Sequence, residues 1–121
     1  MAKILIVEDE QNLNEAYQMI LGSVGLDVYA AYDGAEALEL TQEIEPDLIL
    51  LDLRMPKVGG VEFLKRYNLK KDHPTVKVVI FSNLDTQKEI DDAYKLGADK
   101  YMLKAWASPK ELVQLVNSLV K

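Results

Sequence analysis

Short, almost continuous apolar runs recur along the chain, and longer segments with a different apolar spacing separate them. Each run has three or four residues, which is typical of strands that are buried on both faces of a parallel sheet. The runs are Ile4–Val7, Val28–Ala31, Leu48–Leu51, Val78–Phe81 and Tyr101–Leu103. The pattern therefore predicts five buried strands.

Between the runs, apolar residues repeat at intervals of three and four, as they do on one face of an α-helix. The segments with this spacing are Leu13–Val24, Ala37–Ile44, Val61–Tyr67, Ile90–Tyr94 and Leu112–Leu119. Asn12 with Glu15, and Ser108 with Glu111, have the spacing of an N-terminal capping box. Gly97 stands where a helix C-cap is expected. Five helices should therefore alternate with the five strands.

This alternation predicts an α/β fold, because a helix that crosses over between parallel strands packs on a face of their sheet. Right-handed crossovers give a doubly wound (βα)5 sandwich of three layers. The chain has 121 residues, of which 49% are hydrophobic, and this suits one domain with a real core. We expect that domain to occupy residues 1–121.

Polar residues follow four of the five predicted strands. Glu8 and Asp9 follow the first strand and Asp52 the third, while Ser82 and Lys104 follow the fourth and fifth. Open parallel sheets bind ligands in the crevice beyond the carboxyl ends of their strands. Three carboxylates, a hydroxyl and an ammonium should therefore share one pocket, which suits a divalent metal and a phosphoryl group.

Composition excludes several other functions. A net charge of -6 argues against binding to nucleic acid or to an anionic membrane, since both need clustered Lys and Arg. The absence of cysteine excludes disulfides, thiolate metal sites and a cysteine nucleophile. The apolar run at the start is too short for a signal peptide or a transmembrane helix. We expect a cytoplasmic location.

Taken singly, each polar residue has a simpler interpretation. Glu8 and Asp9 suit the approach to a helix N-terminus, where the helix dipole favours negative charge. Asp52 suits the end of a strand, and Ser82 suits the cap of a turn. The simpler interpretation of Lys104 is an ordinary solvated lysine. The functional interpretation depends on the whole set, in which every member falls at a strand end.

This ordered set resembles the receiver domain of two-component response regulators. The resemblance rests on Glu8–Asp9, Asp52–Pro56 with Gly60, Ser82 and Lys104, and it extends from the first strand to the last helix. It implies a flavodoxin-like fold whose parallel strands have the order 2-1-3-4-5.

The resemblance also implies a chemistry. Asp52 accepts a phosphoryl group from a phosphohistidine and forms an acyl phosphate. Mg²⁺, or Mn²⁺ in its place, is held by Asp9, Asp52 and the backbone carbonyl of Arg54, while Glu8 reaches the metal through water. Crowding of the carboxylates should raise at least one of their pKa values.

Lys104 and Ser82 then contact the phosphoryl oxygens, the first as a point charge and the second through its hydroxyl. Tyr101 matches an aromatic position that in this family swings inward as the hydroxyl residue moves. The alternative for Tyr101 is a plain, half-buried tyrosine of the fifth strand.

We therefore expect a signalling switch and not an enzyme, apart from promoting its own phosphorylation and dephosphorylation. Phosphorylation should alter the surface of the fourth helix, fifth strand and fifth helix. The implied partners are a sensor histidine kinase or phosphotransfer protein, and a downstream target or fused effector domain. Two alternatives are an interaction module that is never phosphorylated and a small Mg²⁺-dependent phosphohydrolase. Arg54 counts against the phosphohydrolase, since the haloacid-dehalogenase group has an acid at that position.

The chain departs from the family pattern next to two site residues. Ala105 follows Lys104 where proline is usual, and we expect a trans peptide bond there, because a cis bond without proline costs about 2.5–4 kcal/mol. Asn83 replaces the usual small residue after Ser82, where it narrows access to the phosphoryl group or orients the attacking water. Trp106 should lie at the rim of the pocket or plug the loop away from it.

Overall fold

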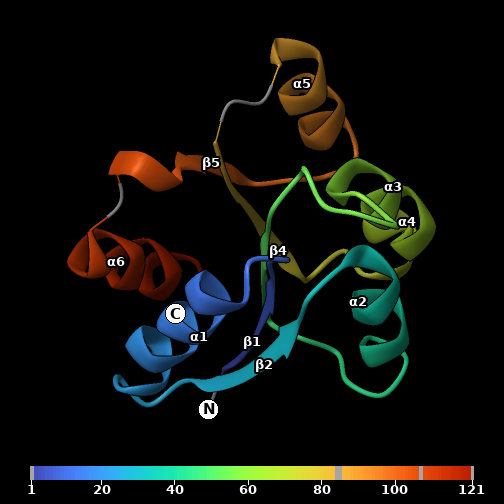
Figure 1. Ribbon diagram of the computed structural model, residues 1–121. Helices are drawn as coiled ribbons and strands as arrows, with labels where there is room; N and C mark the ends of the chain where they lie inside the picture. Colours follow the sequence, from blue (N-terminus) through green and yellow to red (C-terminus); the bar gives the residue numbers. More distant parts are fainter. Residues whose placement is uncertain (1, 84–85, 107, 121) are drawn as a thin grey trace.

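The computed structural model describes residues 2–83, 86–106 and 108–120, and a five-stranded sheet runs through its middle (Figure 1). The strands are β1 (Lys3–Val7), β2 (Asp27–Ala31), β3 (Leu48–Leu51), β4 (Lys77–Ser82) and β5 (Lys100–Leu103). All of them pair in parallel, in the order β2-β1-β3-β4-β5. The five predicted strands and their predicted order are confirmed.

The described residues form six α-helices and one 3-10 turn. They are α1 (Gln11–Gly22), α2 (Gly34–Leu40), α3 (Gly60–Tyr67), α4 (Leu69–Asp72), α5 (Gln87–Lys95), α6 (Pro109–Val120) and the turn η1 (Lys104–Trp106). The single turn α4 is an addition to the five predicted helices. Asn68, with a φ of 56°, separates α3 from α4. Asparagine adopts this left-handed conformation more readily than most residues.

Two of the predicted helix ends are wrong. α1 begins before Asn12, and Glu10 is its N-cap without a side-chain capping bond, so Asn12 and Glu15 form no capping box. α2 ends at Leu40 and does not continue to Ile44. At this end the Thr41 hydroxyl donates to carbonyls in the last turn of α2, which competes with continuation of the helix.

Two other end signals are confirmed. The Ser108 hydroxyl accepts a hydrogen bond of 3.1 Å from the backbone N–H of Glu111, at the start of α6. Gly97 follows the C-cap of α5 with a φ of 113°, a conformation that L side chains rarely adopt.

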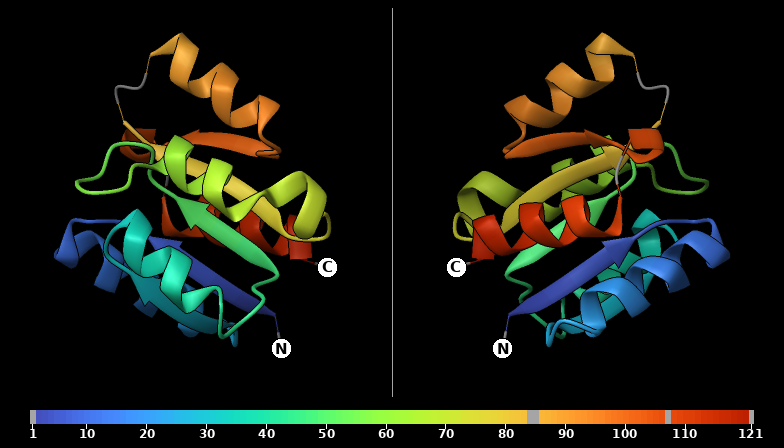
Figure 2. Two further views of the ribbon diagram at one scale, coloured as in Figure 1. Left: turned by 90° about the vertical axis from the view of Figure 1, so that its right-hand side faces the viewer. Right: turned by 90° about the vertical axis from the view of Figure 1, so that its left-hand side faces the viewer.

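Helices cover both faces of the sheet (Figure 2). Alternate strand residues point to opposite faces, so Leu5 and Val7 belong to one core, whereas Ile4 and Ile6 belong to the other. The first core lies under α2, α3 and α5, and the second lies under α1 and α6. All four of these β1 side chains are fully buried. The predicted doubly wound, three-layer sandwich is confirmed.

The strands all run in one direction, so their carboxyl ends meet at one edge of the molecule, and the marked chain ends lie at the other edge (Figure 2). Among the helices of the described ranges, none is long and apolar enough to cross a membrane.

Candidate functional site

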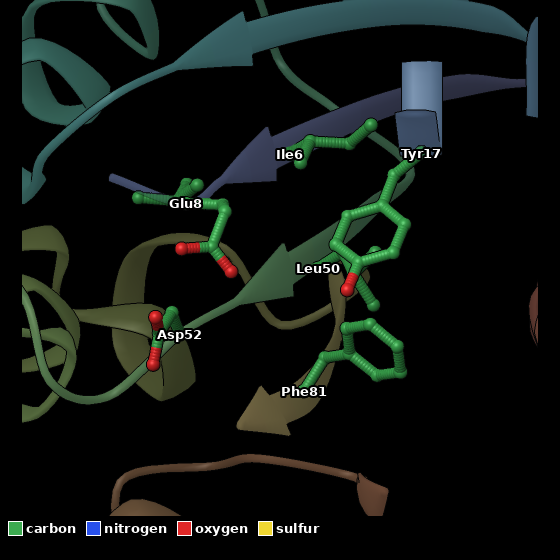
Figure 3. Close-up of a pocket in the computed structure, with 7 residues that line it drawn as sticks. Ile6, Glu8, Tyr17, Leu50, Asp52 and Phe81 are labelled. Atoms are coloured by element: carbon green, nitrogen blue, oxygen red, sulfur yellow. The ribbon is translucent and has the colours of Figure 1, made fainter. Parts of the chain in front are cut away.

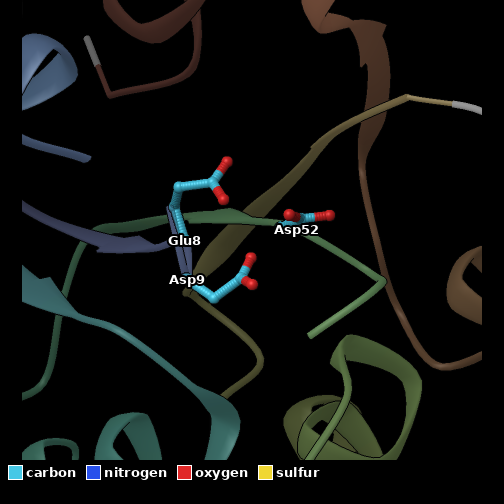
Figure 4. Close-up of side chains that lie close together, drawn as sticks. All are labelled: Glu8, Asp9 and Asp52. Carbon is cyan, nitrogen blue, oxygen red and sulfur yellow. The ribbon is translucent and has the colours of Figure 1, made fainter. Parts of the chain in front are cut away.

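All five polar residues singled out in the sequence lie at the carboxyl edge of the sheet. Glu8 and Asp9 directly follow β1, and Asp52 directly follows β3. Ser82 is the last residue of β4, one position earlier relative to the strand end than predicted, and Lys104 opens η1 immediately after β5. Figure 4 shows Glu8, Asp9 and Asp52 at the ends of β1 and β3.

The Asp52 carboxylate is buried and uses both oxygens. Its Oδ1 accepts hydrogen bonds from the Ser82 hydroxyl at 2.7 Å and from the Arg54 backbone N–H at 3.2 Å. Its Oδ2 accepts from Lys104 Nζ at 3.1 Å. Because only 6% of Asp52 is exposed, these contacts replace most of the water that a free carboxylate would bind.

Glu8 is buried as deeply as Asp52. Its Oε1 accepts from Lys104 Nζ, and its Oε2 accepts from the Glu10 backbone N–H at 3.1 Å. Burial raises the pKa of the Glu8 carboxyl to about 7, against the opposing effect of the hydrogen bond from Lys104. The expected rise of a carboxyl pKa is confirmed, but burial contributes more to it than repulsion by Asp52 does.

Lys104 therefore bridges the two buried carboxylates. Its side chain is 10% exposed. Burial alone would lower the pKa of Lys104, but the hydrogen bond to Glu8 and the charge of Asp52 outweigh that effect, so the pKa lies above its ordinary value. The ammonium stays charged and balances part of the negative charge of the pocket.

Asp9 completes a group that fits a divalent cation. One carboxylate oxygen each from Glu8, Asp9 and Asp52 lies within 4.8 Å of the others (Figure 4). Asp9 is exposed and the other two are buried, so the group opens to solvent on the side of Asp9. Hard carboxylate oxygens are the donors that Mg²⁺ prefers. The water-mediated role of Glu8 and the use of the Arg54 carbonyl stay predictions.

Two aromatic rings form an apolar wall beside the carboxylates. Tyr17 of α1 and Phe81 of β4 meet edge to face, with ring centroids 4.9 Å apart (Figure 3). Burial raises the pKa of Tyr17 to about 12, so this phenol stays neutral. Glu8 and Asp52 line the same small pocket, and this apolar surrounding helps to explain the raised pKa of Glu8.

Asn14 supports the site, and the sequence analysis missed it. This residue of α1 is fully buried, and its amide donates to the backbone carbonyls of Glu8 and Ala31 at 3.0 Å each. It thereby fixes the backbone at the end of β1. The available signal was a polar residue next to Leu13 and three before Tyr17, on the apolar face of the predicted helix.

The loop after Asp52 is held close to the sheet by Gly60. The Gly60 N–H donates to the Leu53 carbonyl at 2.9 Å. A Cβ at Gly60 would stand 2.6 Å from the carbonyl oxygen of Asp52 and 2.8 Å from the Cα of Leu53. Only glycine allows this close approach of two backbone segments.

Arg54 connects that loop to α5. Its guanidinium donates to Glu89 Oε1 at 2.9 Å, and Glu89 also forms the capping box of α5 with Thr86. The hydrogen bond from the Thr86 backbone, followed by that from Arg54, lowers the pKa of Glu89 below its ordinary value.

The remaining sequence predictions concern β5 and the loop after it. Tyr101 is half-buried and packs against the core under α3 and α5, and its movement with Ser82 stays a prediction. None of the peptide bonds within the described ranges is cis, so the expected trans bond between Lys104 and Ala105 is confirmed. The side chain of Trp106 lies outside the described residues.

Sequence comparison defines the family of this chain. Residues 4–117 match the family described as response regulator receiver domain. A probable transcriptional regulator, ycf27 of Porphyridium aerugineum, is 33% identical over 119 residues, which are 98% of this chain and 48% of that protein. The chain thus spans about half the length of this curated relative.

Solved structures agree with this assignment. The receiver domain of Francisella response regulator 1452 has a TM-score of 0.85 and 32% identity, with 99% of this chain and 97% of that chain covered. The chemotaxis protein CheY4 of Vibrio cholerae has a TM-score of 0.89 and 25% identity, with 98% of each chain covered. The chain belongs to the response regulator receiver domain family, whose members act in two-component signalling.

Proposed function

We propose that this protein is a phosphorylation-controlled switch whose phosphoryl acceptor is Asp52. One observation carries the proposal: the buried Asp52 carboxylate contacts a hydroxyl at 2.7 Å and an ammonium at 3.1 Å, beside two further carboxylates. A nucleophile, a cation site and two groups able to bind phosphoryl oxygens are thus gathered at one strand edge. Phosphoryl transfer depends mainly on such positioning and charge neutralisation.

In the proposed reaction an Asp52 oxygen attacks the phosphorus of a phosphohistidine. The new oxygen–phosphorus bond forms as the phosphorus–nitrogen bond breaks, and the imidazole leaves with that electron pair and takes up a proton. Lys104 and the Ser82 hydroxyl bind the phosphoryl oxygens. Mg²⁺, or Mn²⁺, would be held by Asp9, Asp52 and the Arg54 carbonyl, with Glu8 acting through water, and it neutralises phosphoryl charge when bound.

Both phosphoryl-binding residues already hold Asp52, so phosphorylation must rearrange them. Ser82 ends β4 and Lys104 follows β5, so the rearrangement is passed to the surface formed by α5, β5 and α6. Tyr101, half-buried on β5, moves inward with Ser82. Two conformations within a few kcal/mol of each other are enough for such a switch.

The proposed partners are a sensor histidine kinase or phosphotransfer protein on the input side and an effector on the output side. The curated relative is a probable transcriptional regulator about twice as long as this chain, which supports a fused effector domain as one form of output. We propose that residues 1–121 form the receiver domain, that it works in the cytoplasm, and that it binds neither nucleic acid nor membranes directly.

The test is incubation with Mg²⁺ and acetyl phosphate, followed by intact-mass measurement. The wild-type protein should gain one labile phosphoryl group, and Asp52→Ala should gain none while it keeps its cooperative melting transition. Asp91→Ala, which removes an exposed aspartate of α5, is the matched control and should be phosphorylated normally.

Three results would contradict the proposal. Release of phosphate with turnover, and no labile phosphoryl group on the protein, would identify a phosphohydrolase. A wild-type protein that takes up no phosphate, or an Asp52→Ala protein that takes up as much as the wild type, would show that Asp52 is not the acceptor and would favour an interaction module.

A further inference from the structure

The two residues that depart from the family pattern contact each other. The backbone N–H of Ala105 donates to Asn83 Oδ1 at 3.3 Å. Proline, the usual residue at the position of Ala105, has no N–H to donate. The small residue usual at the position of Asn83 has no acceptor in its place. The hydrogen bond exists because both positions differ from the pattern.

This bond joins the two segments that carry the phosphoryl-binding groups. Ser82 and Leu103 are the last residues that β4 and β5 pair in register. Asn83 follows Ser82, and Ala105 follows Lys104, so the bond lies just beyond the paired strands. Asn83 and Ala105 are exposed, whereas Ser82 is buried and the Lys104 side chain is 10% exposed. The bond therefore forms at the exposed rim, one residue beyond each of the two residues that contact Asp52.

We propose that Asn83 is a positioning residue for phosphoryl transfer to Asp52, acting through Lys104. By holding the peptide N–H of Ala105, it fixes the single turn η1 that begins with Lys104. The Lys104 ammonium is thereby kept at the place where the phosphoryl oxygens arrive. Without the bond, η1 has more freedom, and the ammonium is less often correctly placed. This inference rests on the proposed function and names the residue that takes over from the missing proline.

The first test separates the hydrogen bond from the bulk of Asn83. Asn83→Leu keeps a side chain of similar size without an acceptor, and Asn83→Ala removes both size and acceptor. Initial rates of phosphorylation by acetyl phosphate should fall in both variants by about three- to tenfold, the effect expected for one lost hydrogen bond. If Asn83 instead limited access, Asn83→Ala would react faster than the wild type and Asn83→Leu would match it, and the proposal would be overturned.

The second test asks whether Asn83 acts through Lys104. In a Lys104→Ala background, Asn83→Leu should cause no further loss of rate, because the group that it positions is absent. An equal loss in both backgrounds would assign Asn83 a separate role, such as orienting a water molecule, and would refute the positioning role.

The third test removes the donor. Ala105→Pro deletes the N–H but also restricts the backbone of Lys104, so the rate of this variant alone is not diagnostic. Adding Asn83→Leu to Ala105→Pro should leave the rate unchanged, since the bond is already gone. Additive losses in the double variant would show that the two residues do not act together.

One readout is independent of phosphorylation. Amide hydrogen exchange of Ala105, followed by NMR in the unphosphorylated protein, should be faster in Asn83→Leu than in the wild type, with the melting temperature nearly unchanged. A wild-type protein that takes up no phosphate would refute the proposed function. Normal phosphorylation of Asn83→Leu beside a phosphorylated wild type would refute this inference alone.

Discussion

Lys104 contacts two carboxyl groups in a place where water reaches them poorly. Glu8 and Asp52 are 3% and 6% exposed, and both accept hydrogen bonds from the same ammonium. Buried charges are tolerated when they are paired and hydrogen-bonded, and removal of one partner leaves the other uncompensated. The pocket is thus a small hydrogen-bonded network around one ammonium, and an arriving cation must fit into it.

Mg²⁺ should raise the melting temperature of the wild-type protein, because a ligand that binds only the folded state stabilises it by mass action. Asp9→Ala should remove most of this increase, since Asp9 is the exposed member of the carboxylate group. Glu8→Ala should remove less of it, because we expect Glu8 to act through water. Differential scanning fluorimetry with and without Mg²⁺ measures the shift.

Glu10→Ala is the matched control for the metal prediction. It removes an exposed acid next to Asp9 that is outside the carboxylate group, so its Mg²⁺ shift should equal that of the wild type. If the Asp9→Ala protein kept the full Mg²⁺ shift, Glu8 and Asp9 would be acids that precede the N-terminus of α1 and would not be metal ligands.

At the scale of residues, the sequence predicted which side chains gather but not how deeply each is buried. Glu8 continues the alternation of Ile4 and Ile6 and so points to the face under α1 and α6. Both faces of this sheet are apolar, so the sequence does not tell which of Glu8 and Asp9 turns inward. The support from Asn14 depends on the carbonyl of Ala31, a distant residue that only the pairing of β1 with β2 brings near.

The elements around the site are held together at their ends. α3 starts at Gly60, against the backbone of Asp52 and Leu53, and α5 starts at a capping box that Arg54 also contacts. Both helix N-termini are therefore linked to the segment that carries Asp52, the proposed phosphoryl acceptor.

Gly60→Ala should lower the free energy of unfolding by about 1–3 kcal/mol and slow the phosphorylation of Asp52, because the new methyl group must push the Asp52 backbone away. Gly22→Ala is the control, since a Cβ there meets no atom within 4 Å. Urea denaturation and initial phosphorylation rates of both variants test this. Equal stability and equal rates in the two variants would show that the loop adjusts without cost.

The capping box of α5 should weaken in acid. The pKa of Glu89 is lower in the folded protein than its ordinary value of 4.5, so its stabilising effect is complete above that value and is lost as the pH falls through the folded pKa. The stability difference between wild type and Glu89→Gln should therefore shrink as the pH falls below about 4.5. Chemical denaturation at a series of pH values measures this difference.

Arg54→Gln is a useful comparison for α5. The Thr86 backbone lowers the pKa of Glu89 more than Arg54 does, so Arg54→Gln should keep most of the pH dependence that Glu89→Gln loses. If the free energy of unfolding depended on pH identically in the wild type and in Glu89→Gln, the ionised Glu89 carboxylate would not be what stabilises the capping box of α5.

The sequence predicted the elements better than their ends. Apolar periodicity extends over whole strands and helices, so it still identifies an element whose predicted end is wrong by a few residues. The ends depend instead on the interactions or conformation of single residues. The Thr41 hydroxyl donates a hydrogen bond to α2, and Asn68 adopts a left-handed conformation before α4. Several residues compete for such roles in the sequence, and tertiary packing decides among them.

At the scale of the whole molecule, we expect the two cores to unfold together, because the strands between them belong to both. Leu112 of α6 is 1% exposed in the core under α1 and α6. Leu112→Ala should lower the free energy of unfolding by about 2–5 kcal/mol, through lost burial and the cavity that remains. Met19→Ala, at a residue of α1 that is 75% exposed, should change it little.

Circular dichroism and the fluorescence of the only tryptophan, Trp106, should report coincident transitions for Leu112→Ala. Two separate transitions would show that the cores unfold independently. The overall architecture was predictable because five buried runs, their alternation with helices and the polar strand ends all require the same sheet.

The central sheet separates two sets of side chains but joins them through its backbone. Alternate residues of one strand, such as Val7 and Ile6 of β1, belong to the two different cores. The hydrogen bond from Ala105 to Asn83 lies just beyond the paired ends of β4 and β5. A shift of either strand end would therefore reach the helices on both faces of the sheet, and not only those on the nearer face.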